Sequence, residues 1–212
     1  MFVLGKEHIF PSIESAGTDG LLAIGGDVHP DRLLLAYRRG IFPWYSEGMP
    51  VLWYSPEKRM VLFPEKLYVS KSMRRLLRKG IFRITFNEDF PTVIRMCKTV
   101  KRKDSDGTWI TDDLERSMLE LHRRGIAQSV EVWKEDKLVG GLYGLDIGTM
   151  FCGESMFHTE SNASKIAFIA LAEWIKEKKY PLIDCQVYTP HLASLGAEEI
   201  SRADFKKYLP LM

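Results

Sequence analysis

The chain has 212 residues, of which 45% are hydrophobic and 27% charged, and its formal net charge is +2. This composition excludes disordered, collagen-like and mini-protein classes, and the length allows one large domain or two unequal ones. The longest apolar run, residues 166–172, is far shorter than the roughly 20 residues that span a bilayer. The N-terminal residues lack the features of a secretory signal, and three scattered cysteines suit a reducing compartment. We therefore expect a cytoplasmic protein that does not enter membranes.

The small net charge conceals a strongly basic segment. Residues 58–103 contain 14 Lys and Arg but 3 acidic residues, so the remainder of the chain is net acidic. Five of the basic residues recur at helical spacing and form a predicted cationic stripe: Lys71, Arg74, Arg75, Arg78 and Lys79. Such a stripe is typical of a surface that binds nucleic-acid phosphates, and the alternative is an ordinary solvated helix face.

The first 60 residues combine closely spaced glycines and prolines with several aromatic side chains. This composition permits only short elements. One helix is predicted over residues 30–39, because Pro30 suits a first helical turn and Gly40 suits a helix end. We expect residues 1–60 to form a small domain of loops and short strands.

From residue 61 to 212 the predicted elements are longer and more regular. In chain order they are a strand (66–69), a helix (70–79), a strand (81–85), two helices (89–100 and 112–124) separated by a turn (104–107), three strands (128–133, 138–145 and from 149), a helix (162–178), a strand (181–187) and a helix (201–209). The order of helix, three-stranded antiparallel meander, long helix and strand resembles the core of acetyltransferase-like (GNAT) folds. We therefore predict an α/β (α+β) protein in which residues 61–212 form an acetyltransferase-like domain with a mixed sheet.

The sequence argues against cofactors and metals. A CoA-dependent acetyltransferase needs a glycine-rich turn before its long helix to bind the pyrophosphate, and residues 156–163 contain no glycine. No ligand spacing relates the cysteines to the histidines or the histidines to one another, which are His8, His29, His122, His158 and His191. A nucleophile made of Cys152 and His191 stays open, although an apolar strand favours Cys152 as a small core residue.

Polar residues interrupt two otherwise apolar segments. In residues 182–187 (LIDCQV), strand alternation places Asp184 and Gln186 on one face and the apolar side chains on the other. Glu154 lies in residues 150–157 (MFCGESMF), where the neighbouring Gly153 suggests a β-bulge or a close approach of another backbone segment. Burial of such groups costs free energy unless they have polar partners. They therefore form either a satisfied structural network or a polar site in an apolar wall.

Eight short segments, spread in order over almost the whole chain, carry a family resemblance. They are residues 20–27 (GLLAIGGD), 37–44 (YRRGIFPW), 52–56 (LWYSP), 107–110 (GTWI), 139–144 (VGGLYG), 151–157 (FCGESMF), 162–165 (NASK) and 182–186 (LIDCQ). Together they resemble the leucyl/phenylalanyl-tRNA–protein transferase family. The resemblance implies a bacterial cytoplasmic enzyme that moves Leu or Phe, and less readily Met, from aminoacyl-tRNA (Leu-tRNA or Phe-tRNA) to proteins with N-terminal Arg or Lys. These products are marked for degradation by the N-end rule pathway.

The resemblance also implies roles for single residues. The pocket for the donor side chain would consist of aromatic, aliphatic and thioether groups, which suit Leu and Phe: Trp44, Trp109, Leu142, Phe151 and Met156. Asp184 and Gln186 would be the catalytic residues, which place the attacking amine against the activated ester. Glu154 would hold the donor aminoacyl group or the cationic acceptor. The cationic stripe would contact the tRNA backbone.

Three other classes stay open. A peptidoglycan-building aminoacyl-tRNA transferase usually carries a duplicated acetyltransferase-like unit, for which 212 residues without an internal repeat leave little room. A CoA-dependent acetyltransferase would bind acetyl-CoA tightly, against the missing pyrophosphate turn. A non-catalytic RNA-binding protein would tolerate Asp184→Ala and Gln186→Ala, because it has no turnover to lose.

Overall fold

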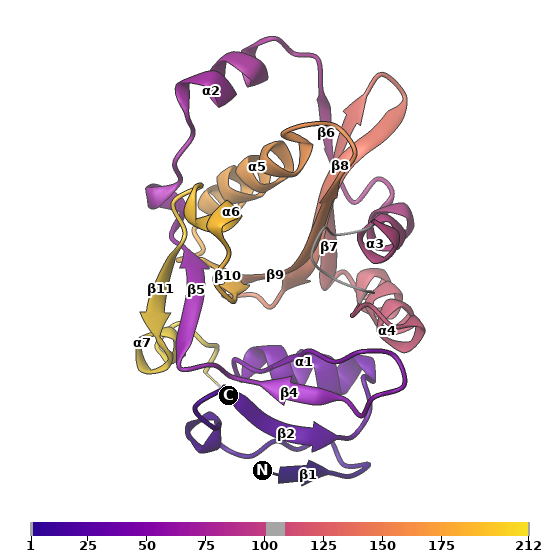
Figure 1. Cartoon of the computed structure of the whole chain (residues 1–212), viewed down its shortest axis with the longest axis vertical. Helices are drawn as coiled ribbons and strands as arrows, with labels where there is room; N and C mark the ends of the chain where they lie inside the picture. Colours follow the sequence, from indigo (N-terminus) through magenta and orange to yellow (C-terminus); the bar gives the residue numbers. More distant parts are fainter. Residues whose placement is uncertain (1, 101–108, 212) are drawn as a thin grey trace.

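The computed structural model describes residues 2–100 and 109–211, which fold around two β-sheets (Figure 1). The smaller sheet has the strand order β1-β2-β4-β3. Its strands are β1 (Phe2–Leu4), β2 (Leu21–Gly25), β3 (Phe42–Pro43) and β4 (Leu52–Tyr54). Helix α1 (Pro30–Arg38) lies between this sheet and the rest of the molecule (Figure 1). The helix predicted over residues 30–39 is therefore confirmed.

The larger sheet has the strand order β11-β5-β10-β9-β8-β7-β6. Its strands are β5 (Lys58–Leu62), β6 (Arg83–Phe86), β7 (Ala127–Lys134), β8 (Lys137–Asp146), β9 (Phe151–His158), β10 (Ile183–Gln186) and β11 (Glu198–Ser201). Neighbouring strands are antiparallel except β9 and β10, which run parallel. The sheet is therefore mixed, and β7, β8 and β9 form the predicted antiparallel meander.

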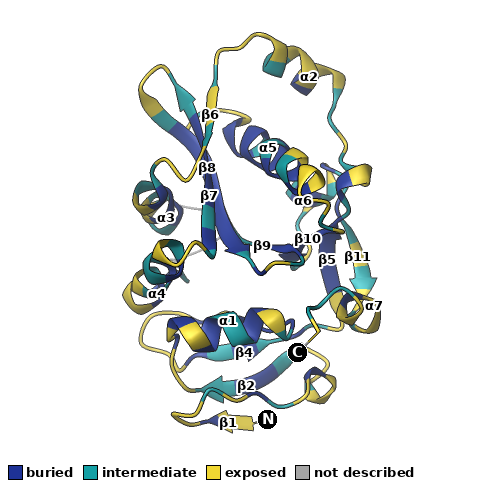
Figure 2. Ribbon diagram, turned by 180° about the vertical axis from the view of Figure 1, so that it is seen from behind, coloured by how far each residue is buried: buried dark blue, intermediate teal, exposed yellow. Residues whose placement is uncertain are grey.

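Helices cover both faces of the larger sheet. Helix α5 (Ala163–Glu177) packs on β7, β8 and β9 from one side, while α3 (Phe90–Thr99) and α4 (Asp112–Arg123) lie on the other (Figure 1). The shorter elements are α2 (Lys71–Arg78), α6 (Pro190–Ala193), α7 (Arg202–Lys206) and the 3₁₀ turns η1 (Ile13–Ser15) and η2 (Pro64–Lys66). Buried side chains form two clusters, one that includes residues of α1, α3 and α4 and one beneath α5. Figure 2 shows these elements coloured by how far each residue is buried.

Three helices begin where the sequence predicts, because a capping side chain stands at each start. Ser70, Asp89 and Thr111 accept hydrogen bonds from backbone N–H groups in the first turns of α2, α3 and α4. Each cap satisfies one of the donors that a helix start leaves without an intrahelical partner.

Other predicted elements are wrong in type or extent. Residues 66–69 form no strand, because the chain leaves η2 and bonds to a loop: the N–H of Tyr68 donates to the carbonyl of Leu195 at 2.9 Å. Strands β5 and β11 and helix α6 are not predicted at all. Helix α7 ends at Lys206 and is shorter than the predicted 201–209. The turn predicted over 104–107 lies outside the described residues.

Within residues 2–100 and 109–211, every helix is too short or too polar to cross a membrane. The three cysteines, Cys97, Cys152 and Cys185, are all free thiols and are buried. Their burial agrees with the interpretation of Cys152 as a small core residue.

Candidate active site

The parallel strands β9 and β10 separate close to the centre of the larger sheet. They pair through Ile183–Phe151 and Asp184–Cys152, and β9 then continues to His158. Beyond these pairs, the Nε2 group of Gln186 on β10 donates a hydrogen bond to Oε1 of Glu154 on β9 at 2.9 Å. We call the region spanned by this bond the β9–β10 fork.

Glu154 reaches the fork because of a β-bulge. Strand β8 pairs with β9 through Tyr143–Ser155 and Gly144–Gly153, which leaves Glu154 as the extra residue. The bulge predicted beside Gly153 is thus confirmed. A bulge aims a side chain differently from regular alternation, and here it directs a carboxylate towards β10.

Gln186 has a backbone conformation that residues other than glycine rarely adopt. Its φ is +62°, in the left-handed region, and the pairing of β10 with β5 shifts register between Asp184 and Gln186. The predicted strict alternation is therefore wrong from this point: Cys185 packs in the cluster beneath α5, whereas Val187 packs against the other cluster. The backbone N–H of Gln186 donates to Oδ1 of Asp184 at 3.0 Å, which holds the unusual conformation.

Asp184 forms a buried ion pair with Arg59 on β5. The Nε and Nη2 groups of Arg59 donate to the two carboxylate oxygens at 2.7 and 2.6 Å, and both residues are 1% exposed. The guanidinium carbon lies 4.7 and 4.6 Å from the ring centres of Phe42 and Phe205, and Nη1 donates to the carbonyl of Gly40. A bidentate pair with further partners is the arrangement that makes buried charges tolerable. Arg59 is a site residue that the sequence does not reveal.

Glu154 has a second partner in the N-terminal part of the chain. The hydroxyl of Tyr37, on α1, donates to Oε1 of Glu154 at 2.6 Å, so this oxygen accepts two hydrogen bonds from uncharged groups. Burial raises the pKa of Glu154 to about 8, although the bonds from Tyr37 and Gln186 act in the opposite direction. The carboxyl is therefore largely protonated at neutral pH. Tyr37, like Arg59, is not among the site residues predicted from the sequence.

Cys152 is adjacent to this network but is a poor nucleophile. Burial, together with the Asp184 carboxylate, raises the pKa of the Cys152 thiol well above its ordinary value. Nucleophilic attack requires the thiolate, which such a pKa makes rare at neutral pH. The arrangement disfavours the Cys152–His191 alternative.

The structure brings some of the predicted pocket residues together and places others apart. Leu142 and Met156 are direct cross-strand partners on β8 and β9, and Phe151 is fully buried in the same cluster beneath α5. Trp109 packs against the other cluster. Trp44 is half-exposed, with its ring 6.1 Å from that of Tyr54.

The predicted cationic stripe is fully displayed on α2. Met73 is buried and turns the helix towards the protein, while the basic side chains Lys71, Arg74, Arg75, Arg78 and Lys79 are all exposed. Figure 2 shows α2 as a largely exposed helix, and it lies at the end of the molecule opposite the smaller sheet. The stripe is therefore free to meet a large anionic partner.

Comparison with known proteins decides the family. The family model for leucyl/phenylalanyl-tRNA protein transferase matches residues 61–210, and the model for the N-terminal domain of the same family matches residues 26–57. The leucyl/phenylalanyl-tRNA–protein transferase of Flavobacterium johnsoniae is 54% identical over 209 residues, with 99% of each chain covered. The chain belongs to the leucyl/phenylalanyl-tRNA–protein transferase family.

Further relatives agree with this membership. The leucyl/phenylalanyl-tRNA–protein transferase of Pseudomonas entomophila is 54% identical over 202 residues, covering 94% of this chain and 89% of the relative. Among solved structures, an aminoglycoside acetyltransferase from an uncultured soil sample covers 62% of this chain and 89% of its own, with 16% identity and a TM-score of 0.40. As a member of the leucyl/phenylalanyl-tRNA–protein transferase family, the protein is an aminoacyltransferase.

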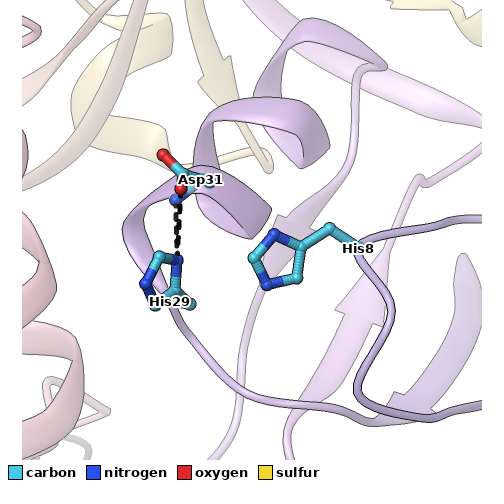
Figure 3. Close-up of side chains that lie close together, drawn as sticks. All are labelled: His8, His29 and Asp31. Carbon is cyan, nitrogen blue, oxygen red and sulfur yellow. Dashed lines mark hydrogen bonds and ion pairs between the residues drawn. The ribbon is translucent and has the colours of Figure 1, made fainter.

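The structure also brings His8 close to His29 and Asp31. Each of the three offers one possible ligand atom within 4.8 Å of the others (Figure 3). Two of them already have partners: Nδ1 of His29 accepts from the backbone N–H of Asp31 at 3.3 Å, and the Asp31 carboxylate pairs with Arg124 at 2.6 Å. The group stands at the start of α1, where the helix dipole disfavours a cation.

Proposed function

We propose that the protein transfers Leu or Phe, and less readily Met, from aminoacyl-tRNA to the α-amino group of proteins with N-terminal Arg or Lys. The transfer would occur in the cytoplasm and mark the acceptors for degradation by the N-end rule pathway. The observation that carries the proposal is the hydrogen bond between Gln186 and Glu154 across the β9–β10 fork, in a chain of this family.

The chemistry requires positioning more than activation. An aminoacyl ester is already activated, so the enzyme must hold the acceptor amine against the carbonyl and receive a proton as the amide bond forms. Because the –NH₂ group of Gln186 is committed to Glu154, its amide oxygen is the atom that accepts a hydrogen bond from the amine. A neutral amide is a weak base and does not keep the proton. As the bond to the tRNA 3′ oxygen breaks, one amine proton passes to that leaving oxygen, directly or through water, and the tRNA departs with a 3′ hydroxyl.

Asp184 acts in this proposal through the backbone. Its carboxylate is occupied by Arg59 and by the N–H of Gln186, so it fixes the position of Gln186 rather than polarising the side-chain amide. Glu154 presents a largely neutral carboxyl to the fork, which suits contact with the donor ester more than with a cationic acceptor.

Selectivity for the donor side chain would come from the apolar residues beside the fork. Leu142, Phe151 and Met156 form a continuous apolar wall, and Trp44 and Trp109 are proposed to complete the pocket. Such a wall favours large apolar donor side chains and offers no hydrogen-bond partner to polar ones. The stripe on α2 would hold the tRNA backbone, which gives affinity without sequence preference.

A transfer assay tests the proposal. Purified protein is mixed with radiolabelled Leu-tRNA or Phe-tRNA and with two peptides that differ only in an N-terminal Arg or Ala. We expect label in the Arg peptide alone. The Gln186→Ala variant should lose most of the transfer, whereas Gln128→Ala on β7 removes an amide elsewhere and should leave it unchanged. Transfer to neither peptide would refute the proposal and favour a non-catalytic tRNA-binding protein.

A further inference from the structure

A cavity of about 310 Å³ opens between the start of α2, the first turn of α5 and the end of α6. Its walls contain three hydroxyl groups, one ammonium group and one aromatic ring, which come from Ser70, Ser72, Ser194, Lys165 and Tyr68. We call this cavity the α2–α5 groove. None of these residues has a role in the mechanism described above.

Tyr68 presents an exposed ring on a fixed backbone. Its side chain is 61% exposed, yet its N–H donates to the carbonyl of Leu195 at 2.9 Å. The adjoining turn fits closely: Gly196 has a φ of +98°, and a Cβ there would lie 2.1 Å from the carbonyl oxygen of Lys66. Rigid, exposed aromatic rings are the platforms on which unpaired nucleic-acid bases stack.

The charges around the groove favour an anionic ligand. Lys165 brings an ammonium group to the wall of the groove, and burial together with this positive charge lowers the pKa of the neighbouring His191. Among the described residues, the buried Nε2 of His191 has no hydrogen-bond partner. The groove also meets the cationic stripe, since Ser70 caps the helix whose first residue is Lys71. Phosphate groups would therefore find favourable potential from the stripe into the groove.

The short helix α6 connects the groove to the fork. Gln186 ends β10, Thr189 caps α6, and Ser194 and Leu195 at its far end line the groove. In the proposal that follows, a chain bound in the groove reaches Gln186 along α6. A single strand with charged phosphates and stackable bases fits this path, whereas an acceptor with a cationic N-terminus is opposed by the same positive charges.

We infer that the α2–α5 groove binds the single-stranded 3′ end of aminoacyl-tRNA, with a base stacked on Tyr68 and phosphate oxygens on Lys165 and the serine hydroxyls. This inference rests on the proposed function, because it assigns a place to the donor substrate. The stripe then holds the double-stranded body of the tRNA, and the groove leads its end to the fork.

The test measures binding of uncharged tRNA, intact or lacking its 3′-terminal CCA, by fluorescence anisotropy at one salt concentration. We expect the wild type to bind the intact form more tightly. Tyr68→Ala should weaken binding of intact tRNA about tenfold, since stacking of one base on an aromatic ring is worth about that much. Lys165→Ala should also weaken binding of intact tRNA, because a phosphate contact is lost. Both variants should leave binding of truncated tRNA unchanged. Tyr68→Phe keeps the ring and should bind like the wild type. Lys137→Ala, at the exposed start of β8, is the matched lysine control.

Two outcomes would overturn the inference. If Tyr68→Ala weakens intact and truncated tRNA equally, the groove contacts another part of the tRNA. If it leaves both affinities unchanged but raises the KM of the acceptor peptide, the groove belongs to the acceptor. The binding measurement is independent of the transfer reaction. If Tyr68 is needed for CCA-dependent binding but the protein transfers nothing to peptides, the proposed function is refuted and the groove inference is supported.

Discussion

Single residues at this site work largely by holding other residues. Gln186 keeps its left-handed backbone through Asp184, and Asp184 keeps its place through Arg59. Glu154 in turn is held by Gln186 and by Tyr37 from a distant helix. Each of these groups is the hydrogen-bond partner of the next. Removal of one therefore leaves a buried polar atom without a partner, which lowers the free energy of unfolding by more than the loss of one hydrogen bond.

The buried ion pair gives the first stability prediction. Arg59→Met should lower the free energy of unfolding by about 3–5 kcal/mol, because it leaves the Asp184 carboxylate buried without its cation. The double variant Arg59→Met/Asp184→Leu should be clearly more stable than Arg59→Met, since no unpaired charge remains. Urea unfolding followed by circular dichroism measures both. A double variant no more stable than the single one would contradict this account.

The pKa of Glu154 predicts how stability depends on pH. The folded-state pKa is about 8, raised by burial from 4.5, so between these values the folded protein holds a proton that the unfolded chain releases. The stabilisation is complete below pH 4.5 and is lost as the pH rises through 8. Its full size is on the order of 5 kcal/mol, since the pKa differs by about 3.5 units between the two states and one unit corresponds to about 1.4 kcal/mol.

Glu154→Gln tests this dependence, because the amide keeps an acceptor for Tyr37 and cannot titrate. Between pH 5 and pH 8.5 the free energy of unfolding should fall more steeply for the wild type than for the variant. Parallel curves would show that the carboxyl is already ionised in the folded protein.

Sequence patterns located the residues whose character is unusual for their surroundings. A carboxylate beside a glycine in an apolar strand identified Glu154, and polar groups in a buried strand identified Asp184 and Gln186. Tyr37 and Arg59 could not be found this way. A tyrosine on a helix face and an arginine in a basic segment look ordinary, and their partners lie far away in the chain.

At the scale of secondary structure, local signals predicted the elements that carry them. The helices with a capping side chain and a glycine end, and the long strands of the meander, are all present. The elements that the sequence misses or misassigns are short and depend on distant partners: β5 and β11 pair with each other, and the segment after η2 bonds to the turn after α6. Short elements of this kind show little hydrophobic periodicity in the sequence, so they are hard to predict.

Helix α2 carries the prediction for tRNA binding. Reversal of charge in Arg74→Glu/Arg78→Glu should weaken tRNA binding strongly and flatten its dependence on salt, because fewer counterions are released when fewer phosphates are contacted. Titrations at several salt concentrations give the slope of log affinity against log salt. An unchanged slope would mean that the stripe is only a solvated face. Lys137→Glu is a suitable control, as it reverses an exposed charge at the start of β8.

The parts of the molecule are joined through the candidate active site. Arg59 contacts Phe42 and Gly40 on the side of the smaller sheet, Asp184 in the larger sheet and Phe205 on α7. A further link, between Tyr37 and Glu154, joins α1 to the larger sheet. The two sheets therefore cannot separate without breaking the network that places Gln186.

This connection predicts that the protein unfolds in one cooperative transition. Unfolding in urea should give the same midpoint by tryptophan fluorescence, which includes Trp44 and Trp53 of the N-terminal part, and by far-ultraviolet circular dichroism, which is dominated by the larger sheet and its helices. Two separated midpoints would show that the small sheet unfolds independently.

The ring of Phe205 makes the candidate site depend on α7, a helix that takes no part in the proposed chemistry. The ring covers the Arg59 guanidinium, so the wall around the buried charge is complete only when α7 packs against β5. The fork thus relies on contacts between segments far apart in the chain, which are the slowest contacts to form during folding.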